Sequence, residues 1–326
     1  MNATVVLCTC NRCSSLSTAL DSVAAQVLPD SFSWEVIVVD NNSTDQTRGV
    51  VESYCRRDLT RFRYVFEPRQ GLSRARNAGI GAARGEVIAS IDDDVIAEPN
   101  WLRDLTASLH DGRWAGAGGR IVPPLDFTPP SWLTVGGETD LLGALLPLFD
   151  LGEKPCEMKR PPYGANMAFR KEMFDKHGMF RTDLGRCGNR MLMGEDIEFG
   201  SRLMSAGEYL RYEPLAVVEH PVPEERLSKK WFRAWWFGFG CTRILERETR
   251  PSILGIPRAF FTLANQGLRF LPVRILRWAF TFNVPRRFYN YCQVWMTLGE
   301  VTQTYRLLFA GTSAGRQTPS QSAGRP

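Results

Sequence analysis

Short apolar runs of strand length alternate with segments of helical spacing through the first 120 residues of the chain. The runs are rich in Val and Ile and cover Thr4–Cys10, Trp34–Asp40, Arg63–Pro68 and Glu86–Asp94. Segments with helical character follow them, at Leu16–Gln26, Gln46–Arg57, Gly71–Gly85 and Pro99–His110. Strands that alternate with helices in this way predict crossover units and a mainly parallel sheet, which places the chain in the α/β fold class.

The pattern loosens after Gly119, where Pro, Gly and exposed-looking apolar residues predict a loop-rich insertion over residues 119–160. A long loop in a compact domain is usually functional or disordered, and the Trp, Phe and Leu content of this one argues against full disorder. Regular spacing then returns, with a strand and helix over Tyr163–Phe174, a helix over Gly194–Gly207 and a strand over Leu210–His220. We therefore expect residues 1–225 to form one domain.

Arginine and aromatic residues interleave over residues 226–311, in helical stretches broken at Pro251, Pro257, Pro272 and Pro285. Helices that pack on the main domain with arginines at the rim would give this pattern. Helices that lie on an anionic bilayer, with Trp and Phe buried and Arg at the headgroups, would give it as well. The polar tail at 312–326 predicts disorder.

The charge balance and the cysteines limit the class of protein. The 40 basic and 35 acidic residues give a net charge of +5, a mild excess that gathers after Glu224. The N-terminus lacks a basic stretch followed by an apolar one, and no window offers about 18 uncharged apolar residues, so we expect a cytoplasmic chain without a spanning helix. Cys8, Cys10 and Cys13 have no second cysteine pair to complete a zinc site, which favours reduced structural thiols.

Acidic residues follow two of the predicted strands. Asp40 ends the run VIVVD, and Asp92, Asp93 and Asp94 come directly after VIASI. Two carboxylates about 4 Å apart repel by roughly 4 kcal/mol at an effective dielectric near 20. Ligands of open α/β sheets bind outside the carboxyl ends of the strands, and a divalent cation with oxygen ligands would relieve the repulsion there. A solvated acidic turn is the alternative, although it fits poorly directly after a buried strand.

The chain resembles the inverting glycosyltransferases of family 2, which have the GT-A fold, a Rossmann-like sheet flanked by helices; here a helical C-terminal extension follows. Six motifs carry the resemblance, in the order of the family and between Thr4 and His220: VLCTCNR, VVDNNSTDQT, GLSRARNAGI, DDD, GANMAFRKEMF and GEDIEFGSRL. The resemblance implies an enzyme that takes a sugar from a nucleoside diphosphate sugar. It also places the 119–160 insertion on the acceptor side.

The resemblance implies a donor site built from the strand ends. Thr9 and Arg12 would lie beside the nucleotide, and Asp40 would hydrogen-bond the base. Asp92 would contact the ribose, with Asp93 next to it and without a separate role. Arg74 and Asn77 would lie in the loop–helix segment that faces the nucleotide sugar. Cys10 stands where the family often has an aromatic residue, a departure that leaves it near the base without an obvious role.

The metal and the catalytic base come from the same resemblance. Asp94 would hold the metal that bridges the donor diphosphate, and His220 would complete the metal shell, which favours Mn²⁺ over Mg²⁺. A lone histidine is also often structural. Asp196, with Glu195 beside it, would be the general base that activates the acceptor hydroxyl. An acidic first turn that stabilises a helix is the alternative for this pair.

Two other functions remain open at this point. A nucleotidyltransferase also uses acidic metal ligands on such a sheet, but it usually carries a Gly-rich phosphate loop after the first strand, where this chain has CTCNRCSSL. A non-catalytic scaffold that binds nucleotide sugar or membrane is the second alternative. The intact acidic motifs of this chain argue against it. For a glycosyltransferase we expect a saccharide or lipid-linked saccharide acceptor, a peripheral position at the inner face of the cell membrane, and no nucleic acid partner.

Overall fold

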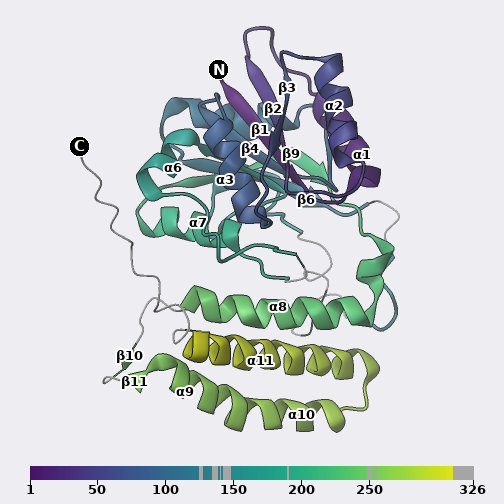
Figure 1. Ribbon diagram of the computed structural model, residues 1–326, viewed down its shortest axis with the longest axis vertical. Coiled ribbons are helices and arrows are strands. Elements are labelled where there is room, and N and C mark those ends of the chain that lie inside the picture. Colours follow the sequence, from purple (N-terminus) through teal and green to yellow (C-terminus); the bar gives the residue numbers. More distant parts are fainter. Residues whose placement is uncertain are drawn as a thin grey trace, which may run out of the picture. The chain divides into compact units, whose positions relative to one another are not determined.

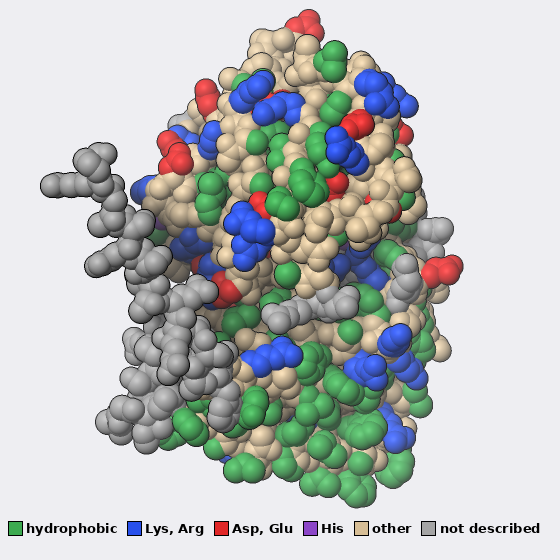
Figure 2. All heavy atoms as spheres, in the orientation of Figure 1, with side chains coloured by type: hydrophobic (Ala, Val, Ile, Leu, Met, Phe, Trp, Pro, Cys, Tyr) green, Lys and Arg blue, Asp and Glu red, His purple; other side chains and the backbone are tan. Residues whose placement is uncertain are grey.

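The chain folds into two compact units, Met1–Trp231 and Phe232–Pro326 (Figure 1). The computed structural model describes residues 1–124, 128–133, 139, 141, 148–188, 191–247, 252–253 and 256–310. Acidic and basic side chains intersperse over the N-terminal unit, whereas apolar side chains gather over the C-terminal unit, on the face that Figure 2 shows. The tail predicted to be disordered and much of the predicted insertion lie outside the described residues.

The N-terminal unit alternates strands and helices as the sequence predicts. Its strands are β1 (Ala3–Thr9), β2 (Trp34–Asp40), β3 (Phe62–Phe66), β4 (Val87–Asp92), β5 (Ile96–Ala97), β6 (Gly116–Val122), β7 (Cys156–Glu157), β8 (Asn166–Arg170) and β9 (Leu210–Glu219). Its helices are α1 (Cys13–Ala24), α2 (Thr47–Arg57), α3 (Leu72–Ala82), α4 (Trp101–Thr106), α6 (Lys171–His177) and α7 (Glu195–Ser205), with the short helices η1 (Ala107–Asp111) and η2 (Glu224–Leu227).

The strands form one mixed sheet in the order β3-β2-β1-β4-β8-β6-β9-β5, with β7 paired to β9. The half built from β3, β2, β1 and β4 is parallel, whereas β8 runs antiparallel to both of its neighbours. In the parallel half Thr9 lies opposite Asp40, and Cys8 lies opposite Asp92. The acidic residues that follow β2 and β4 therefore meet at one edge of the sheet.

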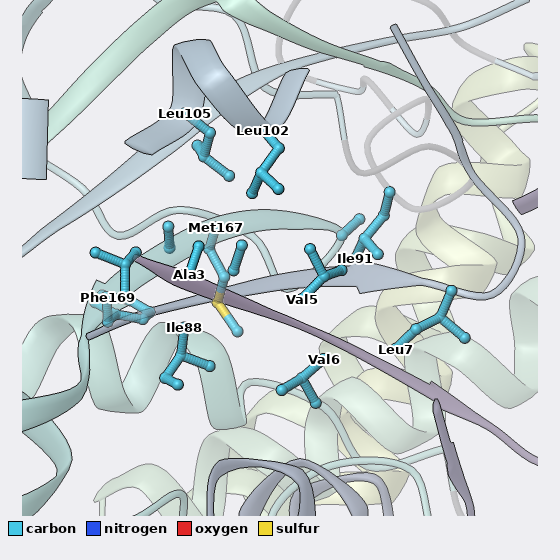
Figure 3. Close-up of a cluster of buried hydrophobic side chains, with 14 of the residues drawn as sticks. Ala3, Val5, Val6, Leu7, Ile88, Ile91, Leu102, Leu105, Met167 and Phe169 are labelled. Carbon is cyan, nitrogen blue, oxygen red and sulfur yellow. The ribbon is translucent and has the colours of Figure 1, made fainter. Parts of the chain in front are cut away.

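Both faces of β1, β2 and β4 are buried, which explains their continuous apolar runs. Figure 3 shows Leu102 and Leu105 of α4 on one side of β1 and β4, while Val6 and Ile88 point to the other side. Helix α3 packs against β1 and β2. Core packing on both faces thus fixes the positions of the strand ends, and loops form the carboxyl edge of the sheet.

Strand β6 extends to Val122, so the loop-rich stretch begins later than residue 119, where the sequence predicted its start. The register between β6 and β9 shifts after Gly119, in a stretch where β9 carries Pro214. A Cβ on Gly119 would lie 2.1 Å from the Ala216 carbonyl oxygen and 2.4 Å from Asn166 Nδ2. The glycine that suggested a loop instead permits a close approach of two backbones at an irregular strand pair.

The C-terminal unit is helical, as predicted for residues 226–311. It contains α8 (Lys229–Arg247, which begins in the N-terminal unit), β10 (Ser252–Ile253), β11 (Ile256–Pro257), α9 (Arg258–Ala264), the π-helical segment η3 (Asn265–Phe270), α10 (Leu271–Ala279) and α11 (Val284–Ala310). Pro285 stands in the first turn of α11, where a proline costs no hydrogen bond. Pro272 follows the π-helical turn η3 within continuous helical backbone, where the missing N–H of a proline removes one hydrogen bond. Among the described residues, no helix is long and apolar enough to cross a membrane.

The Gly119→Ala substitution should lower the free energy of unfolding by about 1–3 kcal/mol, because the added methyl overpacks a backbone contact that cannot relax. Urea denaturation of the purified chain measures this. Gly81→Ala is the matched control, since Gly81 lies in α3 with nothing within 4 Å of its added Cβ, and alanine there should be neutral or stabilising. Equal losses for both variants would contradict the close-approach argument.

Candidate functional site

The loops at the carboxyl edge are held together by buried polar side chains. Asn41, directly after β2, donates hydrogen bonds to the carbonyls of Glu67 and Arg69 at 3.1 and 3.0 Å. Its side-chain oxygen accepts one from the Gly71 amide at 2.7 Å. These three bonds tie the end of β2 to the start of α3, so the wall of the site is fixed before any ligand arrives.

Asp40 and Thr9 are both buried at this edge. Asp40 Oδ1 accepts a hydrogen bond from the Ser43 amide at 2.9 Å, and Oδ2 accepts one from the Tyr64 hydroxyl at 2.9 Å. Burial, together with this hydrogen bond, raises the pKa of Tyr64 to about 12. Each carboxylate oxygen retains a second lone pair, so Asp40 still has acceptor capacity for a ligand.

Asp92, Asp94 and His220 offer three ligand atoms that lie within 4.8 Å of one another. His220 is buried, and its Nδ1 lies 2.9 Å from the carbonyl oxygen of Pro221. A proton on Nδ1 would donate to that carbonyl and leave the lone pair of Nε2 free for a metal. Nε2 lies 3.7 Å from Asp94 Oδ1. Two carboxylates and an oriented imidazole are donors that fit a divalent cation.

Two arginines balance the charge of Asp94. Arg12 Nη1 lies 3.2 Å from Asp94 Oδ2, and Arg226 Nη2 lies 2.8 Å from the same oxygen. Burial alone would raise the pKa of Asp94, but the positive charges of His220 in its protonated form, of Arg226 and of Arg12 outweigh burial and lower it. Arg226 comes from η2, after the end of β9, and sequence reasoning did not select it because nothing local marks that arginine as buried.

Asp93 differs in environment from its two neighbours. Burial, with a further contribution from the negative charge of Asp94, raises the pKa of Asp93 to about 7, although Arg12 and the Thr9 hydroxyl oppose this. The three consecutive aspartates therefore divide into separate surroundings. Asp92 faces a buried arginine, Asp94 faces Arg12 and Arg226, and Asp93 has the weakest compensation of the three.

The buried arginine is Arg76, a second residue that sequence reasoning missed. Only 3% of its surface is exposed. Its Nη2 lies 3.2 Å from Asp92 Oδ1, and its Nη1 hydrogen-bonds Glu195. Arg76 thus bridges the end of β4 and the start of α7. Its position on α3, three residues after buried Ser73 and four before buried Ile80, is a signal of the buried face that could have identified it.

The two residues of α3 selected from the sequence lie on either side of this arginine. Asn77 Nδ2 donates to the Phe180 carbonyl at 2.9 Å, and its oxygen accepts from the Phe180 amide at 3.1 Å. Asn77 therefore holds a loop in place through its backbone. Arg74 is half-buried, and its guanidinium makes no hydrogen bond within the described part of the chain.

Glu195 and Asp196 begin α7 next to Arg76. Asp196 Oδ2 accepts a hydrogen bond from the Gly164 amide at 2.6 Å, and Oδ1 accepts one from the Ile197 amide at 2.8 Å. Burial raises the pKa of Glu195 to about 7, against the opposing charge of Arg76. Burial also raises the pKa of Asp196, with the same opposition. A carboxylate with a raised pKa is a better proton acceptor, which suits a general base.

Known proteins resemble the chain in sequence over most of its length. Residues 4–178 match the family described as Glycosyl transferase family 2. The chain is 30% identical over 240 residues to the succinoglycan biosynthesis protein ExoM of Rhizobium meliloti, covering 72% of both chains. It is 30% identical over 251 residues to a glucosyl-dolichyl phosphate glucuronosyltransferase of Haloferax volcanii, covering 73% of this chain and 76% of the other. A validoxylamine A glucosyltransferase of Streptomyces hygroscopicus subsp. limoneus is 38% identical over 294 residues, covering 81% of this chain and 60% of the other.

Solved structures resemble it in fold. A mannosyltransferase of Pyrobaculum calidifontis, in complex with GDP-Man and Mn²⁺, superposes with a TM-score of 0.54 at 16% identity, covering 98% of this chain and 76% of the other. S. aureus TarS in complex with UDP-GlcNAc gives a TM-score of 0.54 at 16% identity, covering 95% and 92%. The chain therefore belongs to glycosyl transferase family 2, and it is a glycosyltransferase with the GT-A fold.

Proposed function

We propose that this glycosyltransferase moves a sugar from a nucleoside diphosphate sugar to an acceptor hydroxyl, with inversion and with a divalent metal. The observation that carries the proposal is one cluster at the carboxyl edge, in which Asp92, Asp94 and His220 offer ligand atoms beside Arg12 and Arg226. The sugar nucleotides and Mn²⁺ bound to proteins of the same fold support it.

Asp94, His220 and Asp92 are the residues that would hold the metal, and the imidazole favours Mn²⁺ over Mg²⁺. A divalent cation there supplies positive charge that stabilises the leaving diphosphate. Arg12 and Arg226 would bind the same phosphate oxygens, because their guanidiniums already point into the cluster and donate several N–H groups. Asp94 is the counter-charge that keeps both arginines in place while the phosphates are absent.

The nucleoside would lie against the β1 and β2 side of this edge. Asp40 would hydrogen-bond the base with its remaining lone pairs, and Thr9 would line the same wall. Arg74 would contact the nucleotide sugar with its unengaged guanidinium. Asn77 would act indirectly, through the loop that it holds at Phe180. Asp92 would contact the ribose. Asp93 would lie between Asp92 and the metal ligand Asp94, without a separate role.

Asp196 would be the general base. The acceptor oxygen attacks the anomeric carbon from the face opposite to the diphosphate, its proton passes to Asp196, and the bond to the diphosphate oxygen breaks. The amides of Gly164 and Ile197 hold the carboxylate in position for this transfer. Glu195 would support it through Arg76, which links this pair to Asp92 across the site.

The acceptor would be a saccharide or a lipid-linked saccharide used in polysaccharide or glycolipid synthesis. The names of the Rhizobium meliloti and Haloferax volcanii relatives support this class. The 119–160 segment would lie on the acceptor side. We further propose a cytoplasmic location, peripheral on the inner face of the cell membrane, with the C-terminal helices toward anionic lipid. No nucleic acid is proposed as a partner.

Asp94→Asn should remove at least about 99% of sugar transfer, since the loss of several kcal/mol of charge stabilisation costs a hundredfold or more. The same variant should lose the rise in melting temperature that Mn²⁺ with UDP or GDP gives the wild type, because a ligand stabilises only the state that binds it. Glu153→Gln, an exposed acid changed in the same way, is the control. A wild-type Mn²⁺ response in Asp94→Asn would reject Asp94 as a ligand.

Asp196→Asn should lower kcat by about 10²- to 10⁴-fold while the donor KM stays near the wild-type value. The raised pKa of Asp196 means that the basic form is lost as pH falls through that pKa. The wild-type kcat should therefore fall on the acid side at a pH above the ordinary range for aspartate, and this limb should be absent in the variant. A variant that changes only the donor KM would argue against the base.

Arg76→Met should destabilise the fold by about 3–5 kcal/mol, since it leaves Asp92 and Glu195 without their shared counter-charge. Combined with Glu195→Gln, which removes one of the stranded charges, the loss should be smaller than the sum of the two single losses. Chemical denaturation of the four proteins in this cycle measures the coupling. Arg74→Met is the control: Arg74 lies two residues before Arg76 and is partly exposed, so this substitution should change the free energy of unfolding little. Additive losses would show that Arg76 does not act through Glu195.

A further inference from the structure

The C-terminal unit is a stack of three helical layers, with α11 between α8 and the continuous α9–η3–α10 segment (Figure 1). Helices α8 and α11 meet closely, because a Cβ on Gly240 would lie 2.0 Å from the Met296 carbonyl oxygen, and one on Gly299 would lie 2.1 Å from that of Phe237. The α9–η3–α10 layer packs on α11 with one face. Its other face has no covering element among the described residues.

The uncovered face is apolar. Of the eighteen exposed large apolar side chains in the described part of the chain, ten lie within residues 260–284. They are Phe260, Phe261, Leu268, Phe270, Val273, Ile275, Leu276, Phe280, Phe282 and Val284. Figure 2 shows apolar side chains gathered over α9 and α10 with basic ones beside them. We call this set the apolar face; so large an exposed patch marks an interaction surface.

Helix α10 turns one arginine inward and leaves several apolar side chains exposed. Arg274 turns inward, where it donates to the Gln293 carbonyl of α11 at 3.1 Å and to Thr297. Trp278, one turn later, also turns inward and packs on Tyr291 with ring centroids 5.8 Å apart. Val273 and Leu276 are exposed instead. Arg277 is exposed beside these apolar side chains, so the outer face of α10 combines apolar groups with an arginine, which suits a bilayer interface better than water alone.

The charge of the segment narrows the choice of partner. Residues 258–299 contain six arginines and no aspartate, glutamate or lysine. A second copy of the chain docked through the same face would bring arginines against arginines, which opposes association. Anionic lipid headgroups complement the arginines while the acyl region takes the apolar side chains. Since no described helix can span a bilayer, the segment would lie along its surface.

The turn between α10 and α11 is the most exposed part of the apolar face. Phe280 is 71% exposed and Phe282 is 89% exposed, and Val284 follows them. Arg286 and Arg287, both exposed, come directly after this turn in the first turn of α11. Aromatic side chains with arginines one turn away match the depth profile of a bilayer interface, where rings enter the acyl boundary and guanidiniums stay at the phosphates.

We infer that the apolar face docks on an anionic lipid surface, with Phe280 and Phe282 inserted and Arg286 and Arg287 at the headgroups. This surface gives physical form to the peripheral membrane placement and rests on that part of the proposed function. It is independent of the metal cluster and of the base. A lipid-linked acceptor would then be met at the surface on which the enzyme sits.

Sedimentation of the full-length protein with vesicles tests the surface. The wild type should bind vesicles of phosphatidylcholine mixed with phosphatidylglycerol, bind phosphatidylcholine alone much more weakly, and release as salt rises. Phe280→Ser with Phe282→Ser should weaken binding by about tenfold or more, because two buried rings are lost. Arg286→Gln with Arg287→Gln should weaken binding by about thirtyfold, and only to the anionic vesicles.

Matched controls lie in the N-terminal unit. Leu59→Ser with Leu215→Ser changes two apolar side chains that are 79% and 71% exposed, and it should leave vesicle binding unchanged. Arg48→Gln with Arg56→Gln, two exposed arginines of α2, controls for the loss of charge. All variants should keep the wild-type melting temperature and its rise with Mn²⁺ and UDP.

Three results would overturn the inference. They are equal binding to neutral and anionic vesicles, equal losses in the control pairs, and a wild-type dimer that the Phe280→Ser, Phe282→Ser protein no longer forms. The vesicle experiment can fail or succeed independently of the tests of the proposed reaction. Vesicle binding without a rise in melting temperature on adding Mn²⁺ and UDP would support the lipid-binding surface and reject the metal site. A rise in melting temperature without vesicle binding would reject only the lipid-binding surface.

Discussion

Repulsion among carboxylates is the constraint on which the site depends. Five acids, Asp92, Asp93, Asp94, Glu195 and Asp196, gather where β4 ends and α7 begins, and burial raises the pKa of three of them. Charge of this sign cannot be held in a partly buried edge without compensation. The arginines of the site supply it, and their positions decide which acids stay ionised.

The arginines that compensate the acidic charge have two different roles. Arg76 is buried and fixed by Asp92 and Glu195, so its charge is permanent and structural. Arg12 and Arg226 are held by Asp94 through single contacts beside Asp92 and His220. If the proposed cation and diphosphate bound there, Asp94 would be a residue that holds the cation, and Arg12 and Arg226 would be free to bind the phosphates. Asp94 and the two arginines would each keep a partner of opposite charge after this exchange, which lowers the cost of ligand entry.

Local signals predicted the parts of the fold that local forces decide. The apolar runs gave β1, β2 and β4, and the acids directly after them had to meet because parallel strands end at one edge. Arg226 and the pairing of Arg76 with Glu195 could not be predicted in this way. The partners in these contacts are 132 and 119 residues apart. The prediction of a loop at Gly119 was wrong for the same reason: a glycine favours a turn, and its close contact with β9 depends on residues far away in the sequence.

The C-terminal unit shows how much periodicity leaves undecided. The interleaved Arg and aromatic residues over 226–311 predicted helices, and both packing on protein and lying on lipid were open. Periodicity gives the stripes of a helix but not the side on which its neighbour lies. The inward turn of Arg274 onto α11 settles the side, and it leaves Leu276 and Val273 outside. Arg274 is partly buried and its guanidinium is satisfied by α11, so the cost lies in the exposed apolar side chains, and the proposed lipid surface would remove that cost.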